Sequence, residues 1–309
     1  MAEKWNQVIR EHGDVVENQI LRKKIDDIIY KTLDFCDEIP KLEKTEVELQ
    51  VIKNLNSAIT HYLDCINIDK LTYDESHIFV VDLDYYREQF DTNLSAHIVH
   101  DGINSRIIIP RMQDINKFVS VLSHEMVHGI SYQRTKVEFS IGEDKTALTS
   151  PVTIGSTIRF GFRFVKNTDA LDDHQGIDNF TGMNEALTEF IAYRIRMFYY
   201  VAESKKADEI SILSKMSAYI LEFGILHRIL QRYKVCGGDD QDFMADVQRG
   251  YFSGDMTVFK KLKLVHPDAV RLLRDMKYSN IESLLETARG FGLPEYVRYL
   301  EEIAKTIKK

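Results

Sequence analysis

Residues 114–132 read DINKFVSVLSHEMVHGISY and contain the pattern HEMVH at positions 124–128. Asp114 is a favoured helix N-cap residue, and neither Pro nor Gly interrupts the stretch before its second histidine, so one helix is predicted here. Apolar residues recur at helical spacing and predict one buried face: Ile115, Phe118, Val119, Leu122, Met126 and Ile130. The two histidines therefore project from the face almost opposite this stripe.

Two residues four positions apart on a helix lie on the same side, with their Cβ atoms about 6 Å apart. His124 and His128 can therefore bind one metal ion through ring nitrogens at about 2.0 Å. Glu125 lies about 100° around the helix, where a carboxylate can hold a water molecule beside the metal. Two hydrogen-bonded core histidines are the alternative, but the spacing and the intervening glutamate favour a metal site.

A catalytic zinc site has a third protein ligand and one open position. One arrangement places a third histidine six residues after the second, but Arg134 stands there, so that class is excluded. A glutamate on a second helix is the other common solution. Residues 182–190, GMNEALTEF, predict such a helix with Thr181 as N-cap and with Glu185 and Glu189 on one face. Taken alone, these would be two solvated surface glutamates; beside the histidine motif they become ligand candidates.

The motifs HEMVH (124–128) and NEALTE (184–189) together resemble those of the gluzincin metallopeptidases, the thermolysin-like clan, whose second motif is N-E-x-x-S/T-D/E. The resemblance covers the two helices and the strands before them, which is less than half of the chain. It implies that His124, His128 and Glu185 bind one Zn²⁺ ion.

The same resemblance gives roles to the two remaining carboxylates. Glu125 corresponds to the general base, which takes a proton from a zinc-activated water and passes it to the leaving amine. Glu189 falls where the family has a carboxylate that orients a ligand histidine by fixing its tautomer, although Asp is commoner there. A further donor to the scissile carbonyl stays open among these residues: Tyr132, His174, Tyr193, Tyr233, Arg298 and Tyr299.

The expected fold class is α+β, with a zincin-like core that contains a small mixed sheet and the active-site helix, extended by mostly helical N- and C-terminal regions. The expected domains are an N-terminal helical region (1–70), a catalytic core (71–204) and a C-terminal helical subdomain (205–309). Alternating apolar residues predict strands at 76–83, 95–100 and 105–110. The resemblance implies that the edge strand of this sheet pairs with an extended substrate backbone.

Helical patterns are predicted on both sides of this core, at 20–33, 47–63, 210–233, 267–276, 281–288 and 294–307. The chain between the two motifs is longer than in thermolysin-like enzymes, and residues 134–180 are therefore expected to be an insertion beside the cleft. Within it, VTIGSTIRFGFRFVKN (152–167) alternates like a hairpin, and a polar loop containing glycine follows.

The composition excludes several classes of protein. A net charge of −8 argues against a nucleic-acid surface, and the basic run at 260–263 is expected to be a solvated helix face. Cys36, Cys65 and Cys236 are too few for a disulfide framework and are expected to be core or partly buried residues. With no signal pattern and no apolar window long enough to cross a membrane, a cytoplasmic protein without a membrane partner is expected, and signal-less secretion stays open.

The function expected from these features is that of a zinc metallopeptidase acting on a peptide or protein substrate, with an endopeptidase favoured because no G-x-M-E-N exopeptidase signature is present. One alternative is a narrow-specificity regulatory or toxin-type protease that cuts one protein partner. Another is a non-catalytic zinc-binding scaffold, against which the intact Glu125 argues. The oligomeric state stays open.

Overall fold

The computed structural model describes residues 38–69, 71–90, 96–100, 105–141, 152–167, 177–213 and 219–307. Side chains are not described at 100, 134–141, 152–160, 165–167 and 177. The helix expected at 20–33, Cys36 and His174 lie outside the described residues.

A three-stranded mixed sheet lies beside the first described helices. It consists of β1 (Ile78–Val81), β2 (His97–His100) and β3 (Ser105–Pro110), in the order β1-β3-β2. β3 runs parallel to β1 and antiparallel to β2, so the three predicted strands are confirmed. Alternate side chains of β1 and β3 enter two different apolar clusters, the main core and a smaller core under α5 (Leu83–Gln89). Burial on both faces explains why these strands are almost continuously apolar.

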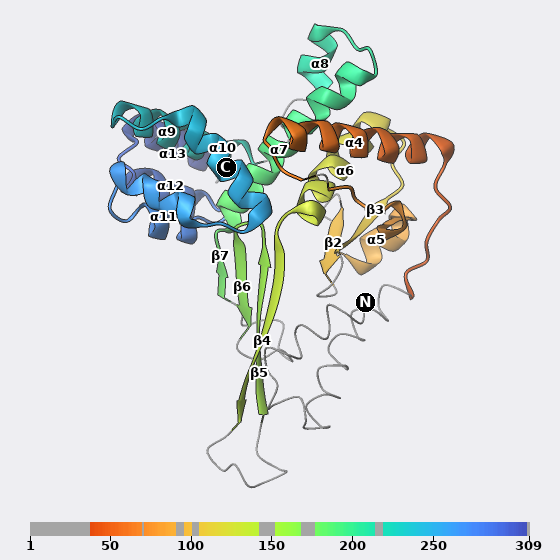
Figure 1. The fold of residues 1–309 in the computed structure, drawn as a ribbon, viewed down its shortest axis with the longest axis horizontal. Coiled ribbons are helices and arrows are strands. Elements are labelled where there is room, and N and C mark those ends of the chain that lie inside the picture. The colour runs from red at the N-terminus through yellow and green to blue at the C-terminus, as the bar shows by residue number, and fades with distance from the viewer. Residues whose placement is uncertain are drawn as a thin grey trace.

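Two helices pack against a third, longer one. α4 (Glu46–Cys65) and α6 (Ile115–Ile130) both pack against α7 (Thr181–Ala202) (Figure 1). The predicted start of α6 is confirmed, because the Asp114 carboxylate accepts hydrogen bonds from the backbone amides of Asn116 and Lys117 at 2.9 and 3.3 Å. The apolar stripe of α6 is buried apart from Ile115, which is partly exposed.

The start of α7 differs from its prediction. Its N-cap is Phe180, in the left-handed region with φ 61°, and not Thr181, which is the first helical residue. The helix needs no side-chain cap because a distant segment holds its first turn. The amide of Phe180 donates to the carbonyl of Arg274 at 2.8 Å, and the amide of Gly182 donates to that of Met276 at 3.0 Å.

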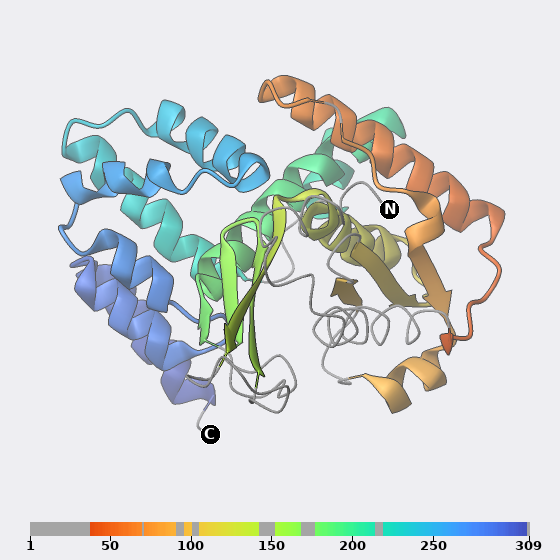
Figure 2. The ribbon, with the colours of Figure 1, turned by 60° about the horizontal axis from the view of Figure 1, so that its bottom comes forward.

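The segment expected as an insertion forms a second sheet, which is entirely antiparallel. Its strands are β4 (Gln133–Ile141), β5 (Val152–Phe160), β6 (Arg163–Asn167) and β7 (Ile177–Asn179), in sequence order. The hairpin predicted at 152–167 is confirmed as β5 and β6. The long strands β4 and β5 extend away from the helices (Figure 1), and the sheet lies between the C-terminal helices and the half that contains β1–β3 (Figure 2).

The C-terminal region is helical, as expected, but with different bounds. Its elements are α8 (Ala207–Leu213), α9 (Ile220–Val235), α10 (Asp240–Ser253), the 3-10 helix η2 (Thr257–Leu264), α11 (Ala269–Asp275), α12 (Ile281–Gly290) and α13 (Pro294–Ile307). The single helix expected at 210–233 is wrong: α8 ends at Leu213, and Tyr219, with φ 56°, precedes α9. α10 was not predicted at all.

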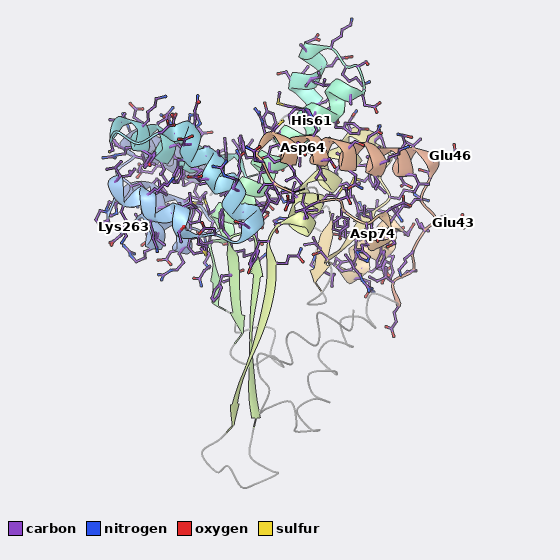
Figure 3. All side chains as sticks on the ribbon, in the orientation of Figure 1. Glu43, Glu46, His61, Asp64, Asp74 and Lys263 are labelled. Atoms are coloured by element: carbon purple, nitrogen blue, oxygen red, sulfur yellow. The ribbon has the colours of Figure 1, made fainter. Side chains whose placement is uncertain are left out.

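The main apolar core is continuous from α4 through α7 to α13. The α-rich fold with small sheets agrees with the α+β class. The basic run at 260–263 lies on η2 with its lysines exposed, and Figure 3 labels Lys263 on the outer side of the C-terminal helices. In the described part of the chain, no helix combines the length and the apolar character needed to span a membrane.

The expectation for the cysteines is wrong where it can be examined. Cys65 and Cys236 are both exposed. Cys65 is the last residue of α4 and Cys236 is the C-cap of α9, so each lies where its helix leaves the core.

Candidate metal centre

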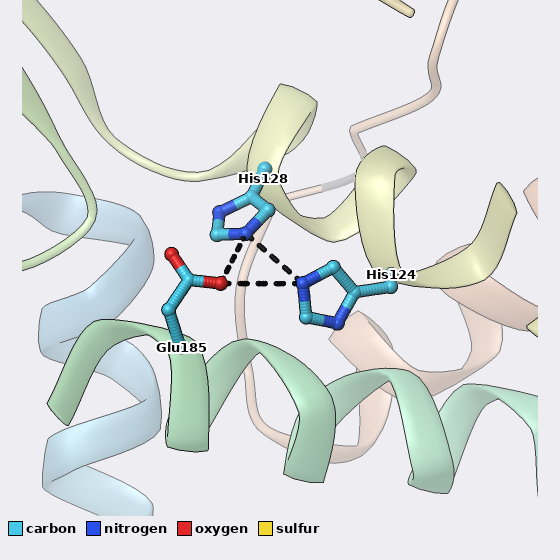
Figure 4. Close-up of side chains that lie close together, drawn as sticks. All are labelled: His124, His128 and Glu185. Atoms are coloured by element: carbon cyan, nitrogen blue, oxygen red, sulfur yellow. Dashed lines mark hydrogen bonds and ion pairs between the residues drawn. The ribbon is translucent and has the colours of Figure 1, made fainter. Parts of the chain in front are cut away.

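α6 and α7 bring three of the predicted residues together around one point. Nε2 of His124 lies 3.2 Å from Nε2 of His128, and Oε2 of Glu185 lies 3.3 and 3.1 Å from these two nitrogens (Figure 4). All three side chains are buried. Among the described residues, they form the one group of histidine, cysteine and carboxylate side chains that could hold a metal ion.

The triangle of ligand atoms fits a tetrahedral metal ion. With bonds of about 2.0–2.1 Å, tetrahedral ligand atoms lie about 3.3–3.4 Å from one another. The three distances here are 3.1, 3.2 and 3.3 Å, so the side chains need little movement to hold an ion. Two imidazoles and a carboxylate are also a donor set that catalytic zinc sites use.

Glu189 and Arg196 support His124 from behind. Nδ1 of His124 lies 2.9 Å from Oε2 of Glu189, so a proton on Nδ1 makes a hydrogen bond to that carboxylate. Oε1 of Glu189 accepts a hydrogen bond from Nη2 of Arg196 at 2.7 Å. The glutamate is 2% exposed and the arginine is 0% exposed, so water does not compete for this ion pair. With its proton on Nδ1, the ring presents the lone pair of Nε2 to the centre.

His128 is supported by neutral groups. Its Nδ1 lies 3.4 Å from Oγ1 of Thr188, which donates to the carbonyl of Asn184 at 2.9 Å. Oη of Tyr251, on α10, lies 2.6 Å from the same Thr188 oxygen. A proton on Nδ1 of His128 can therefore be donated to Thr188, which again leaves Nε2 unprotonated. Once a cation displaces the second ring proton of His124, two nitrogen lone pairs and a carboxylate oxygen can bind it together.

Glu125 is partly exposed beside these ligands. In the described part of the chain, no hydrogen bond or ion pair engages its carboxylate. Burial raises the pKa of Glu125 above its usual value, although His124 and His128 act in the opposite direction. The side chain is therefore placed to accept and return a proton next to the centre.

The charges of the metal-free centre compensate one another. Burial lowers the pKa of His124, but hydrogen bonds to Glu185 and Glu189 outweigh it and raise that pKa to about 10. Burial raises the pKa of both glutamates, but the histidines hold Glu185 well below its usual range, and His124 with Arg196 lowers the pKa of Glu189. The centre thus favours a positive charge between its carboxylates.

The structure adds a tyrosine that the sequence did not single out. The ring of Tyr219 stacks on the ring of His124, with centroids 5.4 Å apart and an angle of 22° between the planes. Burial, followed by the charges of Glu185 and Glu125, raises the pKa of Tyr219, so its hydroxyl keeps its proton and can donate a hydrogen bond. Tyr219 directly follows residues 214–218, which lie outside the described part of the chain, and no local motif marks it.

Two donors considered from the sequence lie in the C-terminal helices. The ring of Tyr233 packs against Phe243 at 5.0 Å, and that of Tyr299 packs against Tyr296 at 5.6 Å. In the described structure, neither ring makes a ring contact with His124 or His128, whereas the ring of Tyr219 contacts His124.

Asn184 connects the second sheet to the helix that carries Glu185. Its Oδ1 accepts hydrogen bonds from the backbone amides of Phe162 and Arg163 at 3.0 and 3.2 Å. The adjoining Gly161 has φ 52°, and a Cβ there would come within 2.5 Å of the Tyr251 ring and 2.8 Å of Asn184. The β5–β6 turn therefore needs glycine to approach the helix that carries Glu185.

No protein-family model, curated protein or solved structure matches this chain. The resemblance to gluzincins therefore rests on the two motifs, and the functional argument rests on the geometry of the centre.

Proposed function

We propose that the protein is a zinc-dependent metallopeptidase that hydrolyses peptide bonds, acting as an endopeptidase. The observation that carries the proposal is the meeting of His124, His128 and Glu185 at mutual distances of 3.1–3.3 Å, beside a Glu125 carboxylate that no described residue engages. A zinc ion held there would supply Lewis acidity, which lowers the pKa of a water molecule and polarises a carbonyl oxygen.

The role of Glu125 follows from its place on the helix. It adjoins one ligand in sequence, and no other described residue holds its carboxylate, so it is available to a substrate or a water molecule. As general base it would accept a proton from water, and as general acid it would return that proton to the leaving amine. A purely structural metal site has no use for such a carboxylate, which favours an enzyme over a scaffold.

The three-stranded sheet supports a peptide substrate. In the described structure, β2 pairs with β3 alone and is an edge strand, and it packs near α6. An extended peptide can add to such an edge through backbone hydrogen bonds, which bind without demanding particular side chains.

Tyr219 is our assignment for the donor that stabilises charge on the scissile carbonyl oxygen. Its ring contacts a ligand histidine, and its protonated hydroxyl lies in the field of Glu185 and Glu125. Tyr219→Phe should lower kcat by about 10²- to 10³-fold, because one donor to the developing oxyanion is lost. Zinc content should stay unchanged, since Tyr219 is not a ligand. An unchanged kcat would remove this role from Tyr219.

A digest of a proteome-derived peptide library tests the proposal as a whole. The purified protein should cleave peptides, a chelator should stop the cleavage, and zinc should restore it. Glu125→Gln should retain zinc and lose hydrolysis by about 10²- to 10⁴-fold, the usual contribution of a general base. Glu46→Gln, an exposed carboxylate on α4, is the control and should behave like the parent.

The digest also separates the alternatives. A narrow-specificity protease would leave the library nearly intact but would cut one folded protein in a chelator-sensitive way. A zinc-binding scaffold would bind metal and cut neither, and Glu125→Gln would change nothing. Cleavage by Glu125→Gln at the parental rate would show that the assigned base is wrong.

A further inference from the structure

Arg196 is a charged side chain in the interior of the protein. It lies on α7 with 0% of its surface exposed. Residues 185, 189 and 196 follow helical spacing, so Arg196 shares the face of α7 that carries the ligand Glu185 and its neighbour Glu189. A buried arginine on the ligand-bearing face needs an explanation that a surface arginine does not.

The contacts of Arg196 reach both helices of the metal centre. On α7, its Nη2 donates to Oε1 of Glu189 at 2.7 Å. On α6, its Nη1 donates to Oγ of Ser123 at 3.1 Å and to the carbonyl of Ser120 at 3.5 Å. Ser123 directly precedes His124 in the chain. One guanidinium therefore joins the helix of the two histidines to the helix of the third ligand.

Fold stability alone does not explain why Arg196 and Glu189 form a buried ion pair. Taking two charges out of water is costly, and replacing a buried ion pair by apolar residues of similar volume is often neutral or stabilising. Three nearby residues of α7, Ile191, Ala192 and Ile195, are apolar and fully buried, so an apolar residue would suit the surroundings of position 196. The pair is better explained by what it does to His124.

We propose that Arg196 is a positioning residue of the metal centre, which holds Glu189 against His124 and so increases the affinity for zinc. The inference rests on the proposed function, because it assumes that the centre binds zinc. In this mechanism the two oxygens of the Glu189 carboxylate have different partners. Oε1 accepts from Arg196, and Oε2 accepts from Nδ1 of His124. With both oxygens committed, the carboxylate cannot rotate, and Nε2 of His124 stays directed at the metal.

The test is a double-mutant cycle between Arg196→Met and Glu189→Gln, in which zinc affinity is measured by competition with a chelator. Thermal unfolding of the metal-free proteins is measured alongside. Arg196→Met should weaken zinc binding by about 10- to 100-fold, the usual effect of removing a partner that orients a ligand. In the Glu189→Gln background the same change should cost less than about threefold, because there is no longer a carboxylate to hold.

Arg111→Met is the matched control. Arg111, between β3 and α6, donates to the buried Glu48 on α4 at 3.2 Å, and α4 carries none of the proposed ligands. Its loss should lower the unfolding temperature while zinc affinity stays within about twofold of the parent. If Arg196→Met does not fold, Arg196→Lys replaces it. Lysine keeps a charge opposite Glu189 but cannot keep the α6 contacts that fix the guanidinium, so its hold on Glu189 loosens and zinc affinity should fall by about three- to tenfold.

Three outcomes decide the inference. A loss of zinc affinity with Arg196→Met that shrinks in the Glu189→Gln background, together with an unaffected control, supports it. Zinc affinity within about twofold of the parent for Arg196→Met, or for Arg196→Lys where that variant replaces it, overturns it. An equal loss in both backgrounds also overturns it, because Arg196 would then act without Glu189. A parent protein that binds no zinc would instead overturn the proposed function itself.

Discussion

The two histidines of the centre come from one helix and point at the same place, yet the groups behind them differ. Behind His124 stand a carboxylate and a guanidinium, Glu189 and Arg196, both buried. Behind His128 stand two hydroxyls, those of Thr188 and Tyr251. The first support is charged and confined to α6 and α7, whereas the second is neutral and reaches α10.

The difference shows that two histidines of one candidate metal centre can be oriented in two ways, by charged groups and by neutral ones. A charge-assisted hydrogen bond is about twice as strong as a neutral one, so the His124 ring is the more firmly fixed of the two. The neutral support costs less to bury and connects the centre to the C-terminal helices. We therefore expect unequal consequences when the two supports are removed.

The largest effect should come from the ligand that both histidines share. Glu185→Ala should weaken zinc binding by well over about 100-fold, since a ligand is lost outright, whereas Glu189→Ala should weaken it by about 10- to 100-fold. Metal content and chelator competition on the two purified variants measure the difference. Equal retention of zinc by both would count against Glu185 as a ligand.

The pH of the solution should have the next largest effect on zinc affinity. Because Glu185 and Glu189 raise the pKa of His124 to about 10, the metal-free protein carries a proton there at pH 7, and zinc must displace it. Apparent zinc affinity should therefore rise about tenfold per pH unit between pH 7 and pH 9.

The stability of the metal-free fold should change in the opposite direction. A histidine whose pKa is raised by folding stabilises the fold fully below its unfolded pKa, near 6.5, and this stabilisation is lost as the pH rises through about 10. Thermal unfolding of the chelator-treated protein at several pH values measures it. Zinc affinity that does not depend on pH would show that no proton is displaced.

The smallest effect should come from the neutral support of His128. Thr188→Val keeps the shape of the side chain but removes the hydroxyl that accepts from Nδ1, so zinc affinity should fall by about fivefold, the equivalent of one neutral hydrogen bond. Thr60→Val is the control, because Thr60 makes the same hydrogen bond to the carbonyl four residues earlier, on α4, away from the centre. A loss as large as that of Glu189→Ala would remove the distinction between the two supports.

The sequence predicted the parts of this centre that are local. Asp114 and the apolar stripe of α6 predict a helix and its buried face, and four-residue spacing places both histidines on one side of it. The strands β1–β3 were predicted because alternation and turn residues are also local signals. Glu185 was found through its motif, and the structure brings it to the histidines.

The parts that the sequence did not predict depend on tertiary contacts. Tyr219 and Tyr251 approach from α9 and α10, and no spacing within the chain relates them to the histidines. Arg196 did leave a signal, a charge at helical spacing from Glu185 and Glu189, but interpreting it requires knowing that this face of α7 is buried. The predicted N-cap of α7 was wrong for the same reason. The backbone carbonyls of Arg274 and Met276 accept from the first turn of the helix in place of a side-chain cap.

The carbonyls of residues 274 and 276 accept hydrogen bonds from the first turn of α7, and this has a consequence for any shortened version of this chain. A truncation before residue 274 would keep both histidines, Glu125 and all of α6. It would also free the amides of Phe180 and Gly182, just ahead of Glu185, from their acceptors. Glu185, the proposed third ligand, would then lie close to a fraying helix end, so a region that contributes no candidate ligand still helps to place one.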